Sequence, residues 1–137
     1  MPLQDQPLVF IVLLNYKTPS VTRRCLLSLQ SLTYSNCRIL VVDNDSEDGS
    51  ASDLAKQFPH LTVIQTGANW GYSGGNNLGM EYAIAQGADY ILILNPDTVL
   101  ANPVFLDEMV YYLQRNPRVG IAGPKVFFQD RSEEHTS

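Results

Sequence analysis

Near its N-terminus the chain reads Leu8-Val9-Phe10-Ile11-Val12-Leu13-Leu14, a continuous apolar run rich in residues that favour extended structure. A strand with one solvated face alternates apolar and polar residues, whereas a strand covered on both faces is apolar throughout. Strands of the second kind are typical of parallel sheets that have helices on both sides. Residues 8–14 therefore predict a buried strand of an α/β fold.

Similar apolar runs recur along the chain and are separated by helical patterns. We expect further strands over residues 38–43, 61–65, 90–94 and 119–122, and a short sixth strand over 125–128. Strands that alternate with helices indicate an α/β fold with a mostly parallel, Rossmann-like sheet flanked by helices. The sequence predicts that this sheet ends after about five or six strands.

The segments between these runs carry apolar residues at helical spacing. Thr18 is expected to cap a helix that starts at Pro19. The inward stripe of this helix is predicted to consist of Val21, Cys25, Leu29 and Leu32. Further helices are expected around Leu54, over residues 78–85 after a glycine-rich loop (67–75), and from Asn102-Pro103 onward with Leu106, Met109, Val110 and Leu113 inward.

Composition narrows the class of protein. The 137 residues are 45% hydrophobic and 17% charged, which favours one globular domain over a disordered or coiled-coil chain. Nine basic and 14 acidic residues give a net charge of −5, which disfavours a nucleic-acid partner. The two cysteines have no metal-binding spacing and favour a reducing compartment. The run 8–14 is too short to span a membrane and follows no basic leader, so we expect a cytoplasmic protein without a transmembrane segment.

Polar residues follow the first four predicted strands. They are Asn15 and Tyr16, then Asp43, Asn44 and Asp45, then the Gly/Asn-rich stretch 67–77, and finally Asn95-Pro96-Asp97. In a parallel sheet these sets lie along one edge, where α/β proteins bind ligands. Three carboxylates that converge there would repel one another, which suggests a cation or hydrogen-bond donors on a ligand. Taken singly, each set is also compatible with a turn or a helix cap.

Together the four sets resemble the motifs of family 2 glycosyltransferases of the GT-A fold, and among these the bacterial rhamnosyltransferase-like enzymes. The motifs are Leu14-Asn15-Tyr16-Lys17, residues 41–50, residues 69–77 and Leu94-Asn95-Pro96-Asp97-Thr98. Each motif is weak alone, but four in this order over roughly residues 8–128 are specific.

The resemblance implies an inverting enzyme that takes a sugar, rhamnose or similar, from a dTDP- or UDP-linked donor. The acceptor would be a hydroxyl of a glycan or of a lipid-linked glycan. By the same resemblance, Asn15 and Tyr16 line the nucleoside pocket, Asp43 accepts a hydrogen bond from the pyrimidine ring, and Asp45 borders the same site.

The later motifs are assigned to the donor sugar and a metal on the same basis. Asn69, Gly71 and Asn76 would shape the nucleotide and donor-sugar pocket, and Asn95-Pro96-Asp97 stands at the family's DxD position. Asp97 would bind Mg²⁺ or Mn²⁺, which prefer oxygen ligands and neutralise the departing diphosphate. Asn95 replaces the first Asp of DxD and brings no charge, so a lower metal affinity is expected.

The resemblance also places the general base in the second half of the domain, and this chain offers no candidate for it. Asp107 and Glu108 fall in a predicted amphipathic helix, where a solvated face explains them. We therefore expect residues 1–130 to form the N-terminal, donor-binding part of the domain. Residues 131–137 are polar and lack apolar periodicity, and one back-translation resembles a sequencing adapter, so this tail is predicted not to be native family sequence.

Two other functions remain open at this point. A receiver-like signalling domain could use Asp43 and Asp97 as a phospho-acceptor pocket, but it would leave the Gly/Asn-rich stretch without a role. A non-catalytic α/β binding domain could keep all four motifs as turns. For a transferase with a lipid-linked acceptor, peripheral contact with the inner membrane face is the alternative to a purely cytoplasmic location.

Overall fold

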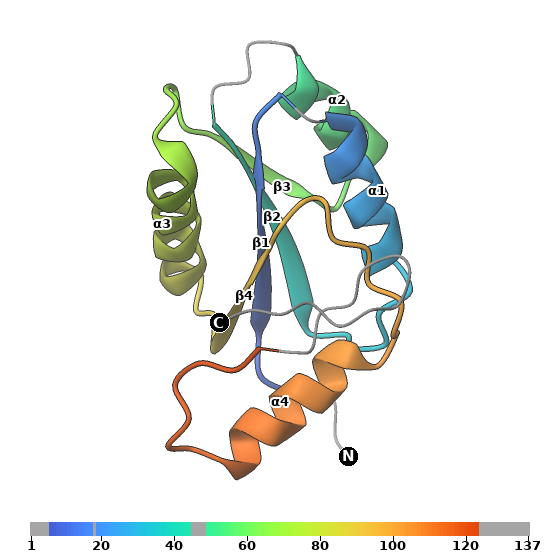
Figure 1. Ribbon diagram of the computed structural model, residues 1–137, viewed down its shortest axis with the longest axis vertical. Coiled ribbons are helices and arrows are strands. Elements are labelled where there is room, and N and C mark those ends of the chain that lie inside the picture. The colour runs from blue at the N-terminus through green and yellow to red at the C-terminus, as the bar shows by residue number, and fades with distance from the viewer. Residues whose placement is uncertain (1–5, 18, 45–48, 124–137) are drawn as a thin grey trace, which may run out of the picture.

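The computed structural model describes residues 6–17, 19–44 and 49–123. In these ranges strands and helices alternate in the order β1 (Val9–Asn15), α1 (Pro19–Leu29), β2 (Cys37–Asp43), α2 (Ser50–Gln57), β3 (Thr62–Gln65), α3 (Gly71–Ala85), β4 (Tyr90–Leu94) and α4 (Phe105–Arg115). The strands form one sheet of order β3-β2-β1-β4, and every pairing in it is parallel (Figure 1). The predicted α/β fold with a parallel sheet is confirmed.

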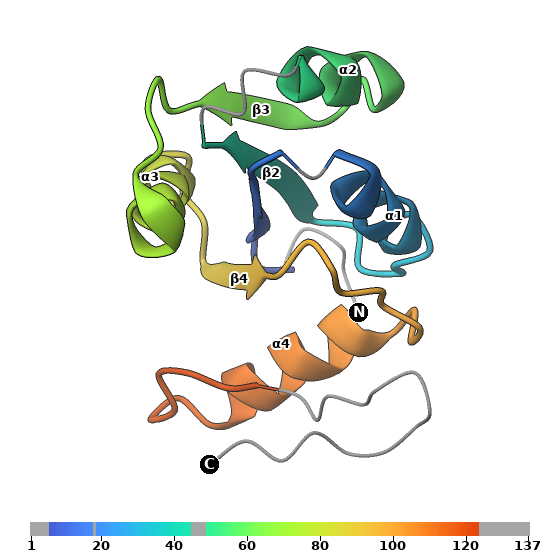
Figure 2. The ribbon, with the colours of Figure 1, turned by 45° about the horizontal axis from the view of Figure 1, so that its top comes forward.

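Helices cover both faces of this sheet. The chain steps outward from β1 through β2 to β3, and then crosses back by α3 to place β4 on the other side of β1. Because parallel crossovers are right-handed, this reversal puts α3 on the face opposite to α1 and α2 (Figure 2). The point of reversal lies between β1 and β4, where α/β proteins of this kind bind ligands.

The predicted burial of β1 on both faces is confirmed residue by residue. Val9, Ile11 and Leu13 pack with buried residues of α1, α2 and α4, whereas Phe10 and Val12 pack on the other face against Ala83 of α3. A strand that contributes to two cores at once gains nothing from polar positions. This explains why residues 8–14 are apolar without interruption.

Helix α3 lies very close to the sheet because its inward face is made of small residues. A Cβ built on Gly79 would come within 2.6 Å of Val12 Cγ1 and 2.9 Å of Val42 Cγ2, and one built on Gly75 would collide with Leu14. The predicted glycine-rich loop over 67–75 is therefore wrong in its second half, since α3 begins at Gly71. Tertiary packing outweighs the poor helix propensity of glycine there.

Two further expectations are corrected. Residues 119–122 form no strand; Ile121 is 93% exposed, and Gly120 and Gly123 flank the segment. Without a neighbouring strand to pair with, apolar character alone does not make a strand. In α1 the buried positions are Thr22, Cys25, Leu26 and Leu29, while Val21 is exposed.

The remaining fold predictions stand as follows. Strands 38–43, 61–65 and 90–94 and a helix start at Pro19 are confirmed within a residue. The last helix starts at Phe105, and it buries Leu106 and Val110 with Met109 and Leu113 half-buried. The proposed cap Thr18, the strand over 125–128 and the tail 131–137 lie outside the described residues. None of the described helices has the length and apolar character needed to cross a bilayer.

Candidate functional site

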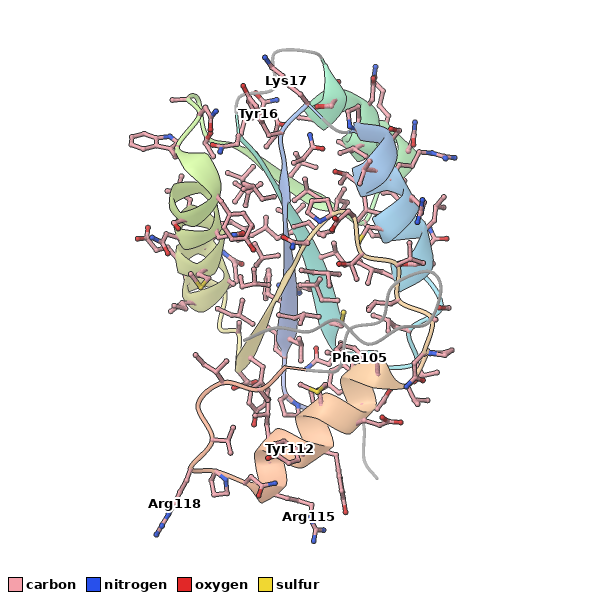
Figure 3. All side chains as sticks on the ribbon, viewed as in Figure 1. Tyr16, Lys17, Phe105, Tyr112, Arg115 and Arg118 are labelled. Carbon is pink, nitrogen blue, oxygen red and sulfur yellow. The ribbon has the colours of Figure 1, made fainter. Side chains whose placement is uncertain are left out.

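The strand register aligns the polar strand ends that the sequence singled out. Asn15 of β1 pairs with Asp43 of β2, and Asp43 pairs with Gln65 of β3. On the other side of β1, Leu94 pairs with Leu13, so Asn95 follows at the same edge. Figure 3 shows this edge at the end of the molecule where Tyr16 and Lys17 are labelled. We call it the carboxyl edge of the sheet.

Asn15 and Asp43 form a buried polar pair at the centre of the carboxyl edge. Asn15 Nδ2 donates to Asp43 Oδ1 at 2.9 Å and to Ser50 Oγ at 3.0 Å, while its Oδ1 accepts from Thr22 Oγ1 at 2.7 Å. Asp43 is only 4% exposed. A carboxylate buried this deeply is held in a fixed orientation by its hydrogen-bond partners.

Asn44 organises the neighbouring loop, which we define as residues 66–71 and call the Asn69 loop. Its Nδ2 donates to Asn69 Oδ1 at 2.9 Å and to the Gly71 carbonyl at 3.1 Å. Its Oδ1 accepts from the Trp70 amide at 2.9 Å and from Thr66 Oγ1 at 3.2 Å. The buried Asn44 side chain thereby makes one contact with each of four residues in the loop.

The predicted residues of the Asn69 loop and of α3 lie near each other in sequence but differ in burial. Asn69 and Gly71 are exposed, and Asn69 Oδ1 accepts from the Gly71 amide at 3.0 Å. Gly71 has a φ of +73°, a left-handed conformation that favours glycine and lets the loop turn directly into α3. Asn76 lies one turn further on and is 5% exposed, on the inward side of α3.

Tyr16 and Lys17 form the exposed rim beside β1. Tyr16 is 38% exposed, and Lys17 Nζ lies 5.2 Å from the centre of its ring. Lys17 has a φ of +55°, which is uncommon for a residue with a side chain. An aromatic face with a cation beside it at a ligand edge is suited to contact a nucleobase or a phosphate.

Asp97 occupies different surroundings at the β4 end of the carboxyl edge. Both Asn95 and Asp97 are exposed. Asp97 lines a cavity of about 480 Å³ together with Pro96 and with Ser20, Val21 and Arg24 of α1. Burial raises the pKa of the nearby Cys25 thiol to about 11, and the negative charge of Asp97 adds to that effect. The cavity therefore brings together an exposed carboxylate, an arginine and a hydroxyl.

The expected convergence of three acids stays a prediction, because Asp45 lies outside the described residues. Among the residues that are described, no group of three or more His, Cys, Asp or Glu side chains could hold a metal ion. Mg²⁺ and Mn²⁺ are commonly held by one or two carboxylates, water and substrate phosphates. The donor set of Asp97 with the amide of Asn95 fits a metal that arrives with a diphosphate.

Four residues that support the site were not singled out from the sequence as site residues. Asn44, Thr66, Thr22 and Ser50 all hydrogen-bond to the predicted site residues or shape the Asn69 loop. Asn44 was expected at this edge with Asp43, but the sequence predicted no role for it. From the sequence alone, a buried asparagine with several hydrogen-bond partners cannot be distinguished from an asparagine that forms a turn.

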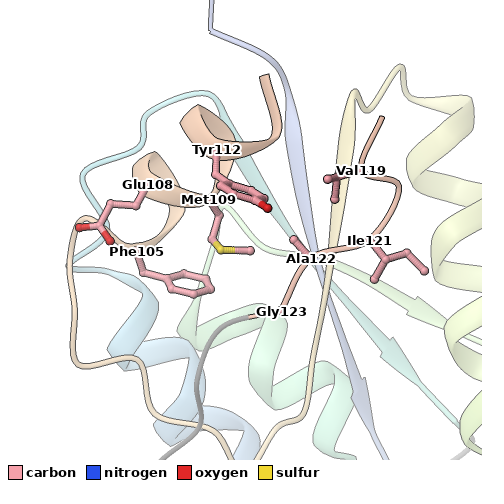
Figure 4. A pocket seen from close by; sticks show the side chains of 8 residues that line it. All are labelled: Phe105, Glu108, Met109, Tyr112, Val119, Ile121, Ala122 and Gly123. Atoms are coloured by element: carbon pink, nitrogen blue, oxygen red, sulfur yellow. The ribbon is translucent and has the colours of Figure 1, made fainter. Parts of the chain in front are cut away.

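A second cavity, of about 470 Å³, lies away from the carboxyl edge, between α4 and residues 119–123 (Figure 4). Its lining is mostly apolar and includes Phe105, Met109 and Tyr112. In Figure 3 Phe105 and Tyr112 lie toward the opposite end of the molecule from Tyr16. This cavity is therefore not part of the candidate site.

Comparison with known sequences decides the family. The model of glycosyl transferase family 2 matches residues 9–136. This chain belongs to that family. The match decides against the receiver-like alternative, whereas the non-catalytic alternative is not tested by it.

Two of the relatives are rhamnosyltransferases. The glycosyltransferase chain is 31% identical over 131 residues to the N-acetylglucosaminyl-diphospho-decaprenol L-rhamnosyltransferase of Mycobacterium tuberculosis. The matched region covers 89% of this chain and 42% of that protein. It is 27% identical over 127 residues to the dTDP-rhamnosyl transferase RfbF of Shigella flexneri, over 93% of this chain and 40% of that protein. The chain thus spans less than half the length of these relatives.

Solved structures agree on the fold. The mannosyltransferase PcManGT of Pyrobaculum calidifontis, in complex with GDP-Man and Mn²⁺, superposes with a TM-score of 0.71 at 20% identity, over 81% of this chain and 33% of that chain. TarS of S. aureus in complex with UDP superposes with a TM-score of 0.69 at 18% identity, over 89% and 39%. The predicted GT-A fold of this glycosyltransferase is confirmed.

Proposed function

We propose that this chain is the donor-binding part of an inverting glycosyltransferase that uses a dTDP- or UDP-linked sugar, rhamnose or a similar hexose. The proposal rests on family membership and on two rhamnosyltransferase relatives. The acceptor would be a hydroxyl of a glycan or of a lipid-linked glycan. Residues 1–130 would form this donor-binding part, and the tail 131–137 would not belong to it.

The observation that supports the proposal most strongly is the buried Asn15–Asp43 pair at the carboxyl edge. A pyrimidine base offers an N–H donor, and the oriented carboxylate of Asp43 is a matching acceptor. Tyr16 supplies an exposed aromatic ring next to this position. The Asn69 loop would close the pocket on the β3 side, with Asn69 and Gly71 beside the donor and the buried Asn76 supporting the pocket from α3, and Asp45 would border the nucleoside.

We assign the diphosphate and the metal to the β4 end of the edge. Asp97 would hold Mg²⁺ or Mn²⁺, and the metal would supply Lewis-acid stabilisation of the departing diphosphate. Asn95 can hydrogen-bond a hydroxyl of the ribose or sugar but brings no charge. With a net charge of −5, the chain would bind a polyanion more tightly with such a cation present.

The general base is not assigned to a residue of this chain. Asp107, for example, accepts a hydrogen bond from Thr33 Oγ1 at 2.5 Å and so ties α4 to the segment after α1. Glu108 is exposed and lines the cavity beside α4, away from the carboxyl edge. This chain alone is therefore expected to bind a donor without turning it over. A cytoplasmic location, or contact with the inner membrane face, remains part of the proposal.

Calorimetric titration of the chain with dTDP, UDP, dTDP-rhamnose and UDP-sugars tests the proposal. We expect saturable binding of at least one pyrimidine nucleotide, strengthened by Mn²⁺ or Mg²⁺. GDP and ADP serve as matched controls that carry the same diphosphate on a purine. Absence of binding by every pyrimidine nucleotide, with and without metal, would contradict the proposal and favour a non-catalytic domain.

A further inference from the structure

Among the described residues beside the carboxyl edge that have no role in the proposed function, Asn44 makes the most side-chain hydrogen bonds. It is 2% exposed, although it follows directly after the last residue of β2. Its backbone amide donates to the Asn15 carbonyl at 2.9 Å, which continues the pairing of β2 with β1 by one residue. The residue is therefore anchored to the sheet through its main chain, and its side chain is free to serve another segment.

That segment is the Asn69 loop. Asn44 Nδ2 donates twice, to Asn69 Oδ1 and to the Gly71 carbonyl, and Oδ1 accepts twice, from the Trp70 amide and from Thr66 Oγ1. Only a side chain amide offers two donors and an acceptor with two lone pairs in one planar group. An aspartate would lose both donors, and a serine or threonine would reach fewer partners.

The Asn69 loop has few other ties to the sheet. Thr66 is joined to β2 by its amide, which donates to the Asp43 carbonyl at 3.0 Å. Trp70 itself is 60% exposed, so its side chain contributes little burial. Most of the loop's connection to β2 therefore runs through one buried asparagine.

We propose that Asn44 is a positioning residue that holds the Asn69 loop in the conformation that forms one wall of the donor pocket. Asp43 and Asn44 then have different roles at the end of β2. Asp43 bonds to Asn15 and would contact the base, whereas Asn44 bonds to the loop. This inference rests on the proposed function, because the pocket that the loop forms is the proposed donor pocket.

Amide hydrogen exchange of the nucleotide-free chain, followed by NMR, tests the positioning step. In Asn44→Ala the Trp70 and Gly71 amides should exchange at least tenfold faster, because the first loses its acceptor and the second loses the partner that orients Asn69. The amides of residue 44 and Thr66 are internal controls, since their acceptors are main-chain carbonyls that the substitution keeps. Unchanged exchange at Trp70 and Gly71 would overturn the inference.

Two further variants keep the test decisive if Asn44→Ala does not fold. Asn44→Asp keeps the acceptor for Trp70 but places a carboxylate against Asn69 Oδ1, so only the Gly71 amide should exchange faster. Thr66→Val removes the hydrogen bond to Asn44 Oδ1 together with those that Thr66 Oγ1 makes with the Ala68 carbonyl and amide, and it should accelerate exchange in the loop about threefold. If neither variant changes exchange in the loop, Asn44 does not position it. Asn36→Ala is the matched control, because Asn36 also donates from its side chain to a main-chain carbonyl, but beside the start of β1.

Nucleotide titration then separates this inference from the proposed function. If the wild-type chain binds a pyrimidine nucleotide, Asn44→Ala should weaken the affinity at least tenfold, and Asn36→Ala should leave it unchanged. Equal affinity of wild type and Asn44→Ala would overturn the positioning role alone. A wild-type chain that binds no nucleotide would overturn the proposed function, and with it the idea that the loop forms a donor pocket.

Discussion

The two halves of the carboxyl edge are built differently. On the β1–β2 side, Asn15, Asp43 and Asn44 are all less than 5% exposed and are fixed by hydrogen bonds to Thr22, Ser50 and the Asn69 loop. On the β4 side, Asn95 and Asp97 are exposed, and Asp97 lines a cavity of about 480 Å³. We call the first the closed side, because hydrogen bonds fix its described side chains, and the second the open side, because its side chains are exposed.

Under the proposed function, this difference explains how the site would recognise a charged donor. A base has a fixed pattern of donors and acceptors, so a rigid, buried carboxylate can be matched to it in advance. A diphosphate with its metal carries most of the charge of the donor and brings its own ligands. An exposed carboxylate avoids the cost of burying that charge before the metal arrives.

The largest effect is expected at Asn15, because its side chain makes hydrogen bonds to three other residues of the closed side. Asn15→Ala removes the hydrogen bonds to Asp43, Ser50 and Thr22 and leaves a buried carboxylate with one partner fewer. We expect the free energy of unfolding to fall by about 3 kcal/mol, measured by urea denaturation. Asn95→Ala is the control on the open side, and it should change stability by less than about 0.5 kcal/mol. Equal losses in both variants would remove the contrast.

A second effect concerns Cys25, which lies on α1 near Asp97. Its pKa of about 11 in the folded chain, raised from 9.0 by burial and by Asp97, means that the folded state keeps the thiol proton longer than the unfolded state. The stabilising contribution is therefore complete below pH 9 and is lost as the pH rises toward 11. By linkage, the loss over this range is about 2 kcal/mol.

Comparison with Cys25→Ala isolates this contribution, because burial also raises the pKa of Cys37 to about 11. The difference in unfolding free energy between wild type and Cys25→Ala should shrink between pH 9 and 11. A difference that does not change with pH would show that Cys25 does not titrate as described.

A smaller effect is expected where α3 packs behind the closed side. Gly79→Ala would place a Cβ within 2.6 Å of Val12 Cγ1 and 2.9 Å of Val42 Cγ2, so α3 must move away from the sheet. We expect a loss of about 1.5 kcal/mol in unfolding free energy. Ser73→Ala, at an exposed position of the same helix, is the control and should be neutral within about 0.5 kcal/mol. A stabilising Gly79→Ala would contradict the close packing of α3.

The sequence was sufficient for the fold wherever one period or one apolar run decided the structure. The run 8–14 predicted β1 and its burial on both faces, and Pro19 predicted the start of α1. Prediction failed where packing with distant residues decides. Gly75 lies in α3, where its lack of a side chain lets the helix approach Leu14 of β1, and residues 119–122 form no strand because they pair with no strand of the described part of the chain.

The site shows the same division. The motifs identified the residues at the carboxyl edge, because parallel strands bring their ends together whatever the side chains do. The motifs did not indicate that Asp43 is buried while Asp97 is exposed, nor that Asn44 serves the loop. Those properties depend on the direction in which each side chain points after its strand ends. That choice is made by partners such as Thr22 and Thr66, which are distant in sequence or carry no signal of their own.

The central claim, that the closed side binds the base and the open side binds the metal with the diphosphate, is tested most directly by one titration series. Wild type, Asp43→Asn and Asp97→Asn are titrated with UDP or dTDP, each with and without Mn²⁺. We predict that Asp43→Asn weakens affinity by about 30-fold or more in both conditions, since it removes a charged hydrogen bond. Asp97→Asn should bind like wild type without metal and should lose only the gain from Mn²⁺. A loss of metal dependence in Asp43→Asn, or metal-free weakening in Asp97→Asn, would contradict the account.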